Sequence, residues 1–168
     1  GLEPLAEYLL SFPAEGNVEE EASKYVTNKE ALSPEDLEKM EKDGLVVKNV
    51  AEALQGAQDI IAEIVSDEPK YRRWIRRLFQ NKGFLCSSVK DEKLDEKHTY
   101  AMYYKYEEPV SEIKLHRVLA INRGESEKVL KVWINEDVDR IMKFLNRQVI
   151  TNPNSVTVPY VQLAIEDG

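Results

Sequence analysis

Apolar side chains recur at every third or fourth position along most of this chain, and this spacing predicts amphipathic helices. The clearest case begins at Val50, after which the apolar residues fall on one helical face: Leu54, Ala57, Ile61, Ile64 and Val65. The same spacing predicts further helices over 2–10, 18–25, 136–149 and 156–165. The pattern therefore predicts a mainly α fold, a multi-helix domain.

One segment near the middle of the chain has the alternation of a strand. Leu130, Val132 and Ile134 alternate with more polar or aromatic positions, which is the period of an extended chain. Phe84 to Val89 is a second candidate strand. We therefore predict a short two-stranded β element that pairs 84–89 with 129–134, after which Asn135 caps the next helix.

The stretch from Leu115 to Ile134 is the least polar long segment of the sequence. Apolar residues spread almost all round a helix that starts at Leu115, and such a helix is usually buried. His116 and Arg123 share its one polar edge, and Gly124 is predicted to end it. We expect this helix to be the centre of the core.

Residues 27–47 have the fewest apolar positions. A helix start is indicated at Ser33, because serine caps a helix and Pro34 suits its first turn. Gly44 is predicted to end this helix. We interpret residues 27–47 as a surface insertion in a single helical domain that spans residues 1–168.

The helix predicted from Pro69 to Asn81 has the sharpest separation of charge. Its apolar face holds Tyr71, Trp74, Ile75, Leu78 and Phe79, and the opposite face holds Arg72, Arg73, Arg76 and Arg77. Guanidinium groups match the geometry of phosphate, so these four arginines are the candidate nucleic-acid-binding residues. The alternative is a solvated face that pairs with the many acids of this chain.

A tyrosine cluster follows later in the sequence. Tyr100, Tyr103 and Tyr104 lie close together, and aromatic rings can stack on bases. No basic set is interleaved with them, so we predict that these tyrosines pack in a core.

The composition excludes several kinds of functional site. The 168 residues carry a formal net charge of −8, which disfavours binding of nucleic acid through the whole surface but permits a local basic patch. Cys86 is the only cysteine, and His98 and His116 match no metal-ligand spacing. The sequence has no nucleophile-elbow, phosphate-loop, dinucleotide or zinc-protease motif. We expect no catalytic residue, no metal and no cofactor, and therefore no enzyme.

The sequence also predicts no association with a membrane. No apolar run approaches the roughly 20 residues that span a bilayer. The first residues lack the basic region of a signal peptide. Because the sequence starts with Gly1 rather than methionine, we expect an internal fragment of a longer protein.

Several strings carry a resemblance to a known family. They are GLEPLA from Gly1, VAEALQGAQDIIAE from Val50, YAMYYKYEEPV from Tyr100, LHRVLAINRGE from Leu115, EKVLKV from Glu127 and QLAIEDG from Gln162. In this order they resemble the Tex family of bacterial transcription accessory proteins over nearly the whole chain, and the HRxLAxxRGE pattern is the most specific. Leu115 and Lys128 depart from the usual serine and glycine, and residues 27–47 look longer than is usual in the family.

The resemblance implies a mostly helical segment of a longer cytoplasmic protein, located after a helix-turn-helix-like part and before an RNase H-like domain. In that family, helix-hairpin-helix elements and an OB-fold RNA-binding module also follow. The implied function is a non-enzymatic scaffold of a transcription accessory factor that binds RNA or DNA mainly through domains outside this chain. One alternative is a docking module for a protein of the transcription machinery. A second is an auxiliary RNA or DNA contact through Arg72, Arg73, Arg76 and Arg77.

Overall fold

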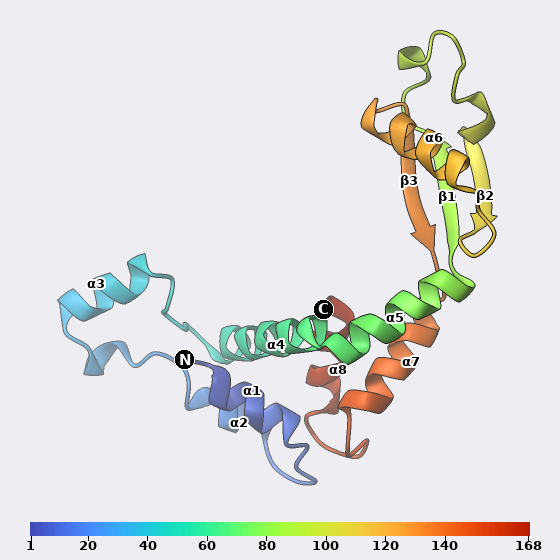
Figure 1. The fold of residues 1–168 in the computed structure, drawn as a ribbon. Coiled ribbons are helices and arrows are strands. Elements are labelled where there is room, and N and C mark those ends of the chain that lie inside the picture. Colours follow the sequence, from blue (N-terminus) through green and yellow to red (C-terminus); the bar gives the residue numbers. More distant parts are fainter. The chain divides into compact units, whose positions relative to one another are not determined.

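The computed structural model describes all residues from Gly1 to Gly168 and is mainly α, as the sequence predicts (Figure 1). The chain divides into two compact units. We call Gly1–Tyr71 with Arg140–Gly168 the helical unit, and Arg72–Asp139 the sheet unit. The prediction of a single domain over residues 1–168 stays a prediction. No helix is both long and apolar enough to cross a lipid bilayer.

The helical unit is built around the helix α4 (Val50–Asp67), whose apolar face is the one that the sequence predicts. The helices that pack on it are α1 (Glu3–Leu10), α2 (Val18–Ser23) and α8 (Val158–Asp167). Ile61 of α4, Leu5 and Leu9 of α1 and Val161 of α8 have no exposed surface. Burial of each such side chain stabilises the fold by about 1.5–3 kcal/mol. Most of α7 (Val138–Val149) also belongs to this unit.

Residues 27–47 form an excursion with a hydrogen-bonded base. The Thr27 amide donates to the Val47 carbonyl oxygen at 2.9 Å, and the Val47 amide donates to Thr27 Oγ1 at 2.8 Å. The excursion contains a short 3-10 helix, Lys29–Ala31, and α3 (Pro34–Lys42), which starts after the predicted cap, Ser33, and has no buried residue. Its surface position agrees with the sequence, and its interpretation as an insertion stays a prediction.

A buried polar cluster joins the start and the end of the helical unit. Thr157 Oγ1, which has no exposed surface, donates to the Leu9 carbonyl oxygen at 2.8 Å. Ser155 Oγ donates to the Pro13 carbonyl oxygen at 2.7 Å and lies 3.0 Å from Thr157 Oγ1. The segment before α8 therefore satisfies the Leu9 carbonyl group, which the end of α1 leaves unpaired, and the Pro13 carbonyl group of the chain that follows α1.

The sheet unit contains a three-stranded antiparallel sheet in the order β2-β1-β3. Its strands are β1 (Phe84–Val89), β2 (Lys105–Pro109) and β3 (Leu130–Asn135), and α5 (Pro69–Lys82) leads into β1. The predicted pairing of 84–89 with the later strand is confirmed, with Cys86 opposite Trp133. The strand β2 was not predicted, because four of its five residues are charged or proline and show no apolar alternation.

The helix α6 (Leu115–Ser126) lies across one face of this sheet (Figure 1). Ile121 packs there with Tyr100, Tyr103, Val129 and Leu130, so the predicted core role of the tyrosines is confirmed for Tyr100 and Tyr103. Arg117 of α6 forms an ion pair with Glu108 of β2 at 3.0 Å, and Tyr106 donates a hydrogen bond to the same carboxylate.

The prediction that this helix is the centre of the core is wrong. Leu115 and Leu119 are 73% and 58% exposed, and only Ile121 and Gly124 of α6 are buried. A helix on a three-stranded sheet can bury a single face, so its other apolar residues stay in water. The larger core surrounds α4 instead.

Two predicted helix boundaries are also wrong. Gly124 lies inside α6, where a Cβ atom would come within 2.5 Å of Leu130 Cδ1, so glycine permits the close approach of β3. The left-handed residue of this turn is Lys128, with φ 63°. Asn135 belongs to β3, and α7 starts later, at Val138.

Replacing Thr157 with valine tests the buried polar cluster. Valine keeps the shape of the side chain but leaves the Leu9 carbonyl oxygen without its donor, so we expect the unfolding free energy to fall by about 1–3 kcal/mol. Urea unfolding followed by far-ultraviolet circular dichroism measures the change. The control is Thr151→Val at an exposed position, where a change within about 0.5 kcal/mol is expected. Equal losses in both variants would contradict a specific role of Thr157.

Candidate functional site

The four arginines singled out from the sequence lie together on α5. Arg72, Arg73, Arg76 and Arg77 are all exposed, whereas Leu78 is buried and Trp74 and Ile75 are half-buried. The predicted separation of faces is therefore confirmed. Tyr71 of the apolar face packs edge-on against Phe144, with ring centroids 6.1 Å apart.

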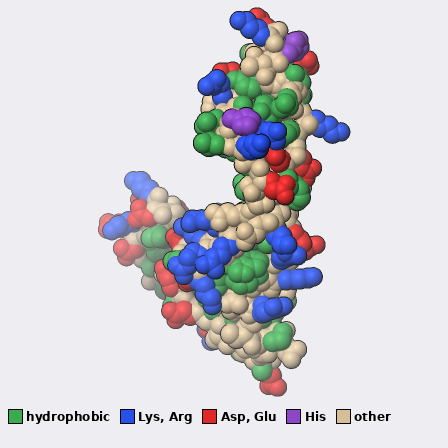
Figure 2. All heavy atoms as spheres, turned by 45° about the vertical axis from the view of Figure 1, so that its right-hand side comes forward, with side chains coloured by type: hydrophobic (Ala, Val, Ile, Leu, Met, Phe, Trp, Pro, Cys, Tyr) green, Lys and Arg blue, Asp and Glu red, His purple; other side chains and the backbone are tan.

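The charge of α5 differs from that of the chain as a whole. Its 14 residues include Lys70 and Lys82 besides the four arginines, and none of them is acidic. Figure 2 shows basic side chains gathered at the level of α5. Exposed guanidinium groups on successive turns can donate paired hydrogen bonds to phosphate oxygens. The role of the four arginines in binding nucleic acid stays a prediction.

A second cluster of polar groups holds the connection between β1 and β2. Asp95, only 4% exposed, accepts hydrogen bonds from the amides of Thr99 and Tyr100, both at 2.9 Å, and from Tyr104 OH at 2.7 Å. Two short 3-10 helices, Glu92–Leu94 and Ala101–Tyr103, lie on either side of this segment. One carboxylate thus fixes the path of the connection.

These hydrogen bonds change the acidity of both partners. Burial tends to raise the pKa of Asp95, but the hydrogen bonds from Tyr104, Tyr100 and Thr99 outweigh it and hold this pKa below its ordinary value. Burial, together with the hydrogen bond to Asp95, raises the pKa of Tyr104 to about 12. At neutral pH the carboxylate accepts and the phenol donates.

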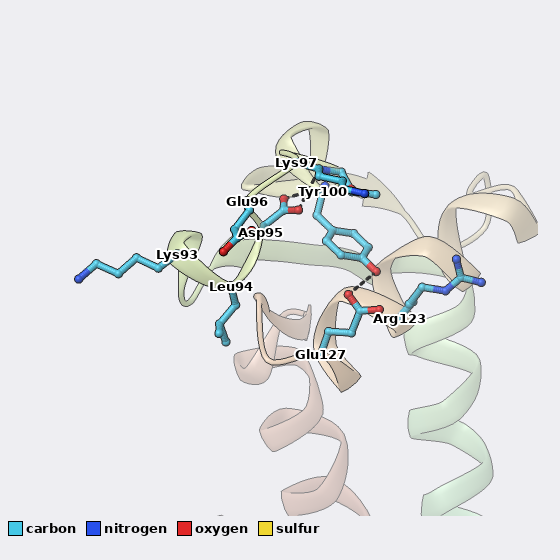
Figure 3. A pocket seen from close by; sticks show the side chains of 9 residues that line it. Lys93, Leu94, Asp95, Glu96, Lys97, Tyr100, Arg123 and Glu127 are labelled. Atoms are coloured by element: carbon cyan, nitrogen blue, oxygen red, sulfur yellow. Dashed lines mark hydrogen bonds between the residues drawn. The ribbon is translucent and has the colours of Figure 1, made fainter.

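A pocket of about 470 Å³ opens beside this cluster (Figure 3). Tyr100 OH donates to Glu127 Oε2 at 2.8 Å across the pocket, whereas the side chains of Lys93 and Arg123 point away from it. Burial and the hydrogen bond to Glu127 raise the pKa of Tyr100, which keeps its proton. Of the groups that line the pocket, Asp95, Tyr100 and Glu127 are joined by hydrogen bonds that hold the fold together.

The histidines and the cysteine lie in different settings. His98 and His116 are exposed. Cys86 is 5% exposed, and burial, followed by the charge of Glu107, raises the pKa of its thiol, which is therefore protonated at neutral pH. No group of three or more His, Cys, Asp or Glu side chains is placed to hold a metal ion.

Asp95 was not among the functional residues predicted from the sequence. It lies in the charged segment 90–97, which has no apolar periodicity and looks like a solvated loop. The amides that Asp95 binds lie four and five residues later, whereas the local turn in which an aspartate is recognised bonds an amide two residues on. The spacing therefore gives little signal. Its role depends on Tyr104, which the fold brings back over the turn.

The hydrogen bond between Tyr104 and Asp95 leads to a prediction about alkaline stability. Tyr104 ionises near pH 10 when unfolded and near pH 12 when folded, so its contribution to stability is complete below pH 10 and is lost towards pH 12. Asp95, with its lowered pKa, contributes above its unfolded pKa and loses this contribution as the pH falls. We expect Tyr104→Phe to remove part of the alkaline loss.

Urea titrations between pH 8 and 12 followed by tryptophan fluorescence measure this loss, because both tryptophans, Trp74 and Trp133, lie in the sheet unit. Tyr160→Phe in the helical unit is the control and should keep the full alkaline loss. An identical pH dependence in the Tyr104→Phe variant and the parent chain would count against the hydrogen bond.

Comparison with known proteins places the chain in a family. A family profile described as Tex central region-like matches residues 15–156. The protein YdcI of Bacillus subtilis is 40% identical over 170 aligned residues, which cover 100% of this chain and 21% of YdcI. The protein tex of Bordetella pertussis is 28% identical over 139 residues, 83% of this chain and 16% of that protein.

A shorter similarity covers about half of the chain. S1 RNA-binding domain-containing protein 1 of Pongo abelii is 35% identical over 86 residues, which are 48% of this chain and 9% of that protein. The chain thus spans about a fifth of the length of YdcI and less of the other two. Because the profile covers most of the sequence, this chain belongs to the Tex central region-like family.

Proposed function

We propose that this chain is a helical scaffold segment of a Tex-like transcription accessory factor, and that the factor binds nucleic acid mainly through its other domains. The observation that carries the proposal is the closed core of the helical unit. Segments as far apart in sequence as α1 and α8 pack on α4, and Thr157 joins their ends. A rigid body of this kind can hold neighbouring domains in a fixed arrangement.

The charge of the chain supports the same division of roles. A net charge of −8 repels a polyanion from most of the surface, and nucleic-acid affinity depends strongly on neutralised phosphates. One relative is named for an S1 RNA-binding domain, and this chain aligns with only 9% of that protein. We propose that such additional domains bind the RNA or DNA. We also propose that the factor is cytoplasmic and that this segment catalyses no reaction.

The arginines of α5 support a second candidate function, an auxiliary contact to RNA or DNA. Arg72, Arg73, Arg76 and Arg77 are exposed on a helix that has no acidic residue. Such a local basic surface can contact phosphates even on an acidic protein. The competing candidate, a docking module for a protein of the transcription machinery, would use the acidic surface and predicts no dependence on these arginines.

A comparison of two proteins tests the scaffold proposal. We expect full-length YdcI, which contains a region matched by the whole chain, to bind a fluorescent single-stranded RNA more tightly than this chain does. Fluorescence anisotropy at matched salt concentrations measures both affinities. Equal affinities of the chain and of YdcI would contradict the proposal, since this segment would then itself account for the RNA binding.

A salt titration tests the arginine contact. Replacement of Arg72, Arg73, Arg76 and Arg77 by glutamine should lower the slope of log affinity against log salt by up to about 3, because each phosphate contact on a single strand contributes about 0.7. The matched control replaces four exposed lysines of the helical unit, Lys29, Lys39, Lys42 and Lys48, by glutamine. If the two variants lose the same slope, the effect is one of net charge and the contact is excluded.

A further inference from the structure

The two faces of the small sheet differ in what covers them. On one face, Leu85, Val132 and Tyr106 pack around the cluster that contains Ile121 of α6. Residues one position along each strand point to the opposite face, because side chains alternate across a strand. Most side chains on that opposite face are exposed, and Cys86 in its centre is buried. We call this side the open face.

The register places the residues of the open face in three rows. Each row takes one residue from β2, one from β1 and one from β3: Lys105, Ser88 and Lys131; Glu107, Cys86 and Trp133; Pro109, Phe84 and Asn135. The row of two lysines is therefore next to the row that contains an indole. The lysine row and the tryptophan row lie about 7 Å apart, which is the length of a two-residue step along a strand.

The open face contains exposed aromatic surface and a pocket. Trp133 is 41% exposed and Phe84 is 39% exposed, although both are large and apolar. A pocket of about 500 Å³ adjoins Trp133, and its lining includes Cys86, Ser88, Lys105 and Trp133. Pockets of this size hold small-molecule ligands, and an aromatic wall favours a ligand with a ring.

The ammonium group of Lys131 lies over the ring face of Trp133. Its Nζ atom lies 5.7 Å from the centroid of the indole ring, over the ring face. An ammonium group in this position gains only about 0.5–1 kcal/mol at an exposed site. A stacked base gains more, about 1–3 kcal/mol, so a base can displace the ammonium group from the ring.

We propose that the open face binds an unpaired nucleotide of a single-stranded nucleic acid, with the base stacked on Trp133 and the adjacent phosphate held by Lys105 and Lys131. Charge complementarity selects this occupant, since both outer positions of the row beside the ring are cations. Glu107 lies across Cys86 from Trp133 and repels phosphate, which fixes the strand with its phosphate at the lysine row. A paired base cannot stack on one indole in this way, so a duplex is excluded.

This site is independent of the arginines of α5 and of the scaffold proposal. Its stacking contribution depends on the sequence-tolerant attraction between a ring and a base, whereas the arginine contact depends on phosphate charge alone. Replacing Trp133 with an uncharged residue should therefore weaken the stacking site and leave the arginine contact unchanged. Failure of either the scaffold or the arginine contact leaves the prediction for Trp133 unchanged.

Tryptophan fluorescence provides the test, performed on the whole chain. In a Trp74→Phe background, Trp133 is the only tryptophan. We expect a short single-stranded oligothymidylate, added at low salt, to quench its emission in a saturable manner. The duplex of the same strand should cause little quenching. Far-ultraviolet circular dichroism confirms that each variant is folded.

Variants separate stacking from charge and from loss of fold. By anisotropy, Trp133→Leu should weaken binding of a labelled oligothymidylate by roughly 5- to 150-fold, and Trp133→Phe should recover most of this loss. Lys105→Gln with Lys131→Gln should lower the salt slope by about 1.4. The control is Leu119→Ala, an exposed leucine on the outer side of α6, which should bind like the parent chain.

Three results would overturn the proposal. The first is an emission of Trp133 that does not respond to the oligonucleotide. The second is equal binding by the parent chain and the Trp133→Leu variant, including the case in which only the arginine variant of α5 loses affinity. The third is binding of duplex that is as tight as binding of the single strand.

Discussion

Close approach to α4 is the constraint on which the helical unit depends. Three helices pack on it, and each brings a buried alanine: Ala6 of α1, Ala22 of α2 and Ala164 of α8. α4 itself presents Ala53 and Ala57 with no exposed surface, and the side chain of Leu2 occupies the space that a Cβ atom on Gly56 would need. Small residues on both sides bring the helices near enough for the larger side chains, such as Ile61 and Leu9, to interdigitate. The arrangement of everything else in this unit, including the polar cluster at Thr157, follows from that proximity.

Periodicity predicted those parts of the fold in which one face of an element is buried. The apolar face of α4, the two faces of α5 and the pairing of β1 with β3 could all be read from the spacing of residues. The partial exposure of α6 could not be read in this way. The sequence shows that Leu115 and Leu119 are apolar, but it does not show how little surface a three-stranded sheet offers to cover them. The strand β2 could not be predicted because its mostly charged sequence pairs through the backbone rather than through apolar side chains.

The candidate sites were predicted to different degrees. The arginines of α5 were found because a charge stripe on an amphipathic helix is a one-dimensional pattern, and the structure keeps them on an exposed surface. The carboxylate of Asp95 and the open face of the sheet depend on partners from other segments, namely Tyr104 for the first and the registered lysines for the second. Cross-strand register is a tertiary property, so no local spacing in the sequence pointed to the row that joins Lys105 with Lys131.

The hydrogen-bonded base of the excursion at residues 27–47 has a practical consequence. Two hydrogen bonds join Thr27 to Val47. The excursion therefore leaves and rejoins the helical unit at the same two positions, whatever its length. Loop-closure entropy grows slowly with length, which makes the intervening segment tolerant of lengthening or shortening. The tip of α3, with no buried residue, is thus a natural attachment point for a fluorophore, an affinity handle or a cross-linker that leaves the helical unit undisturbed.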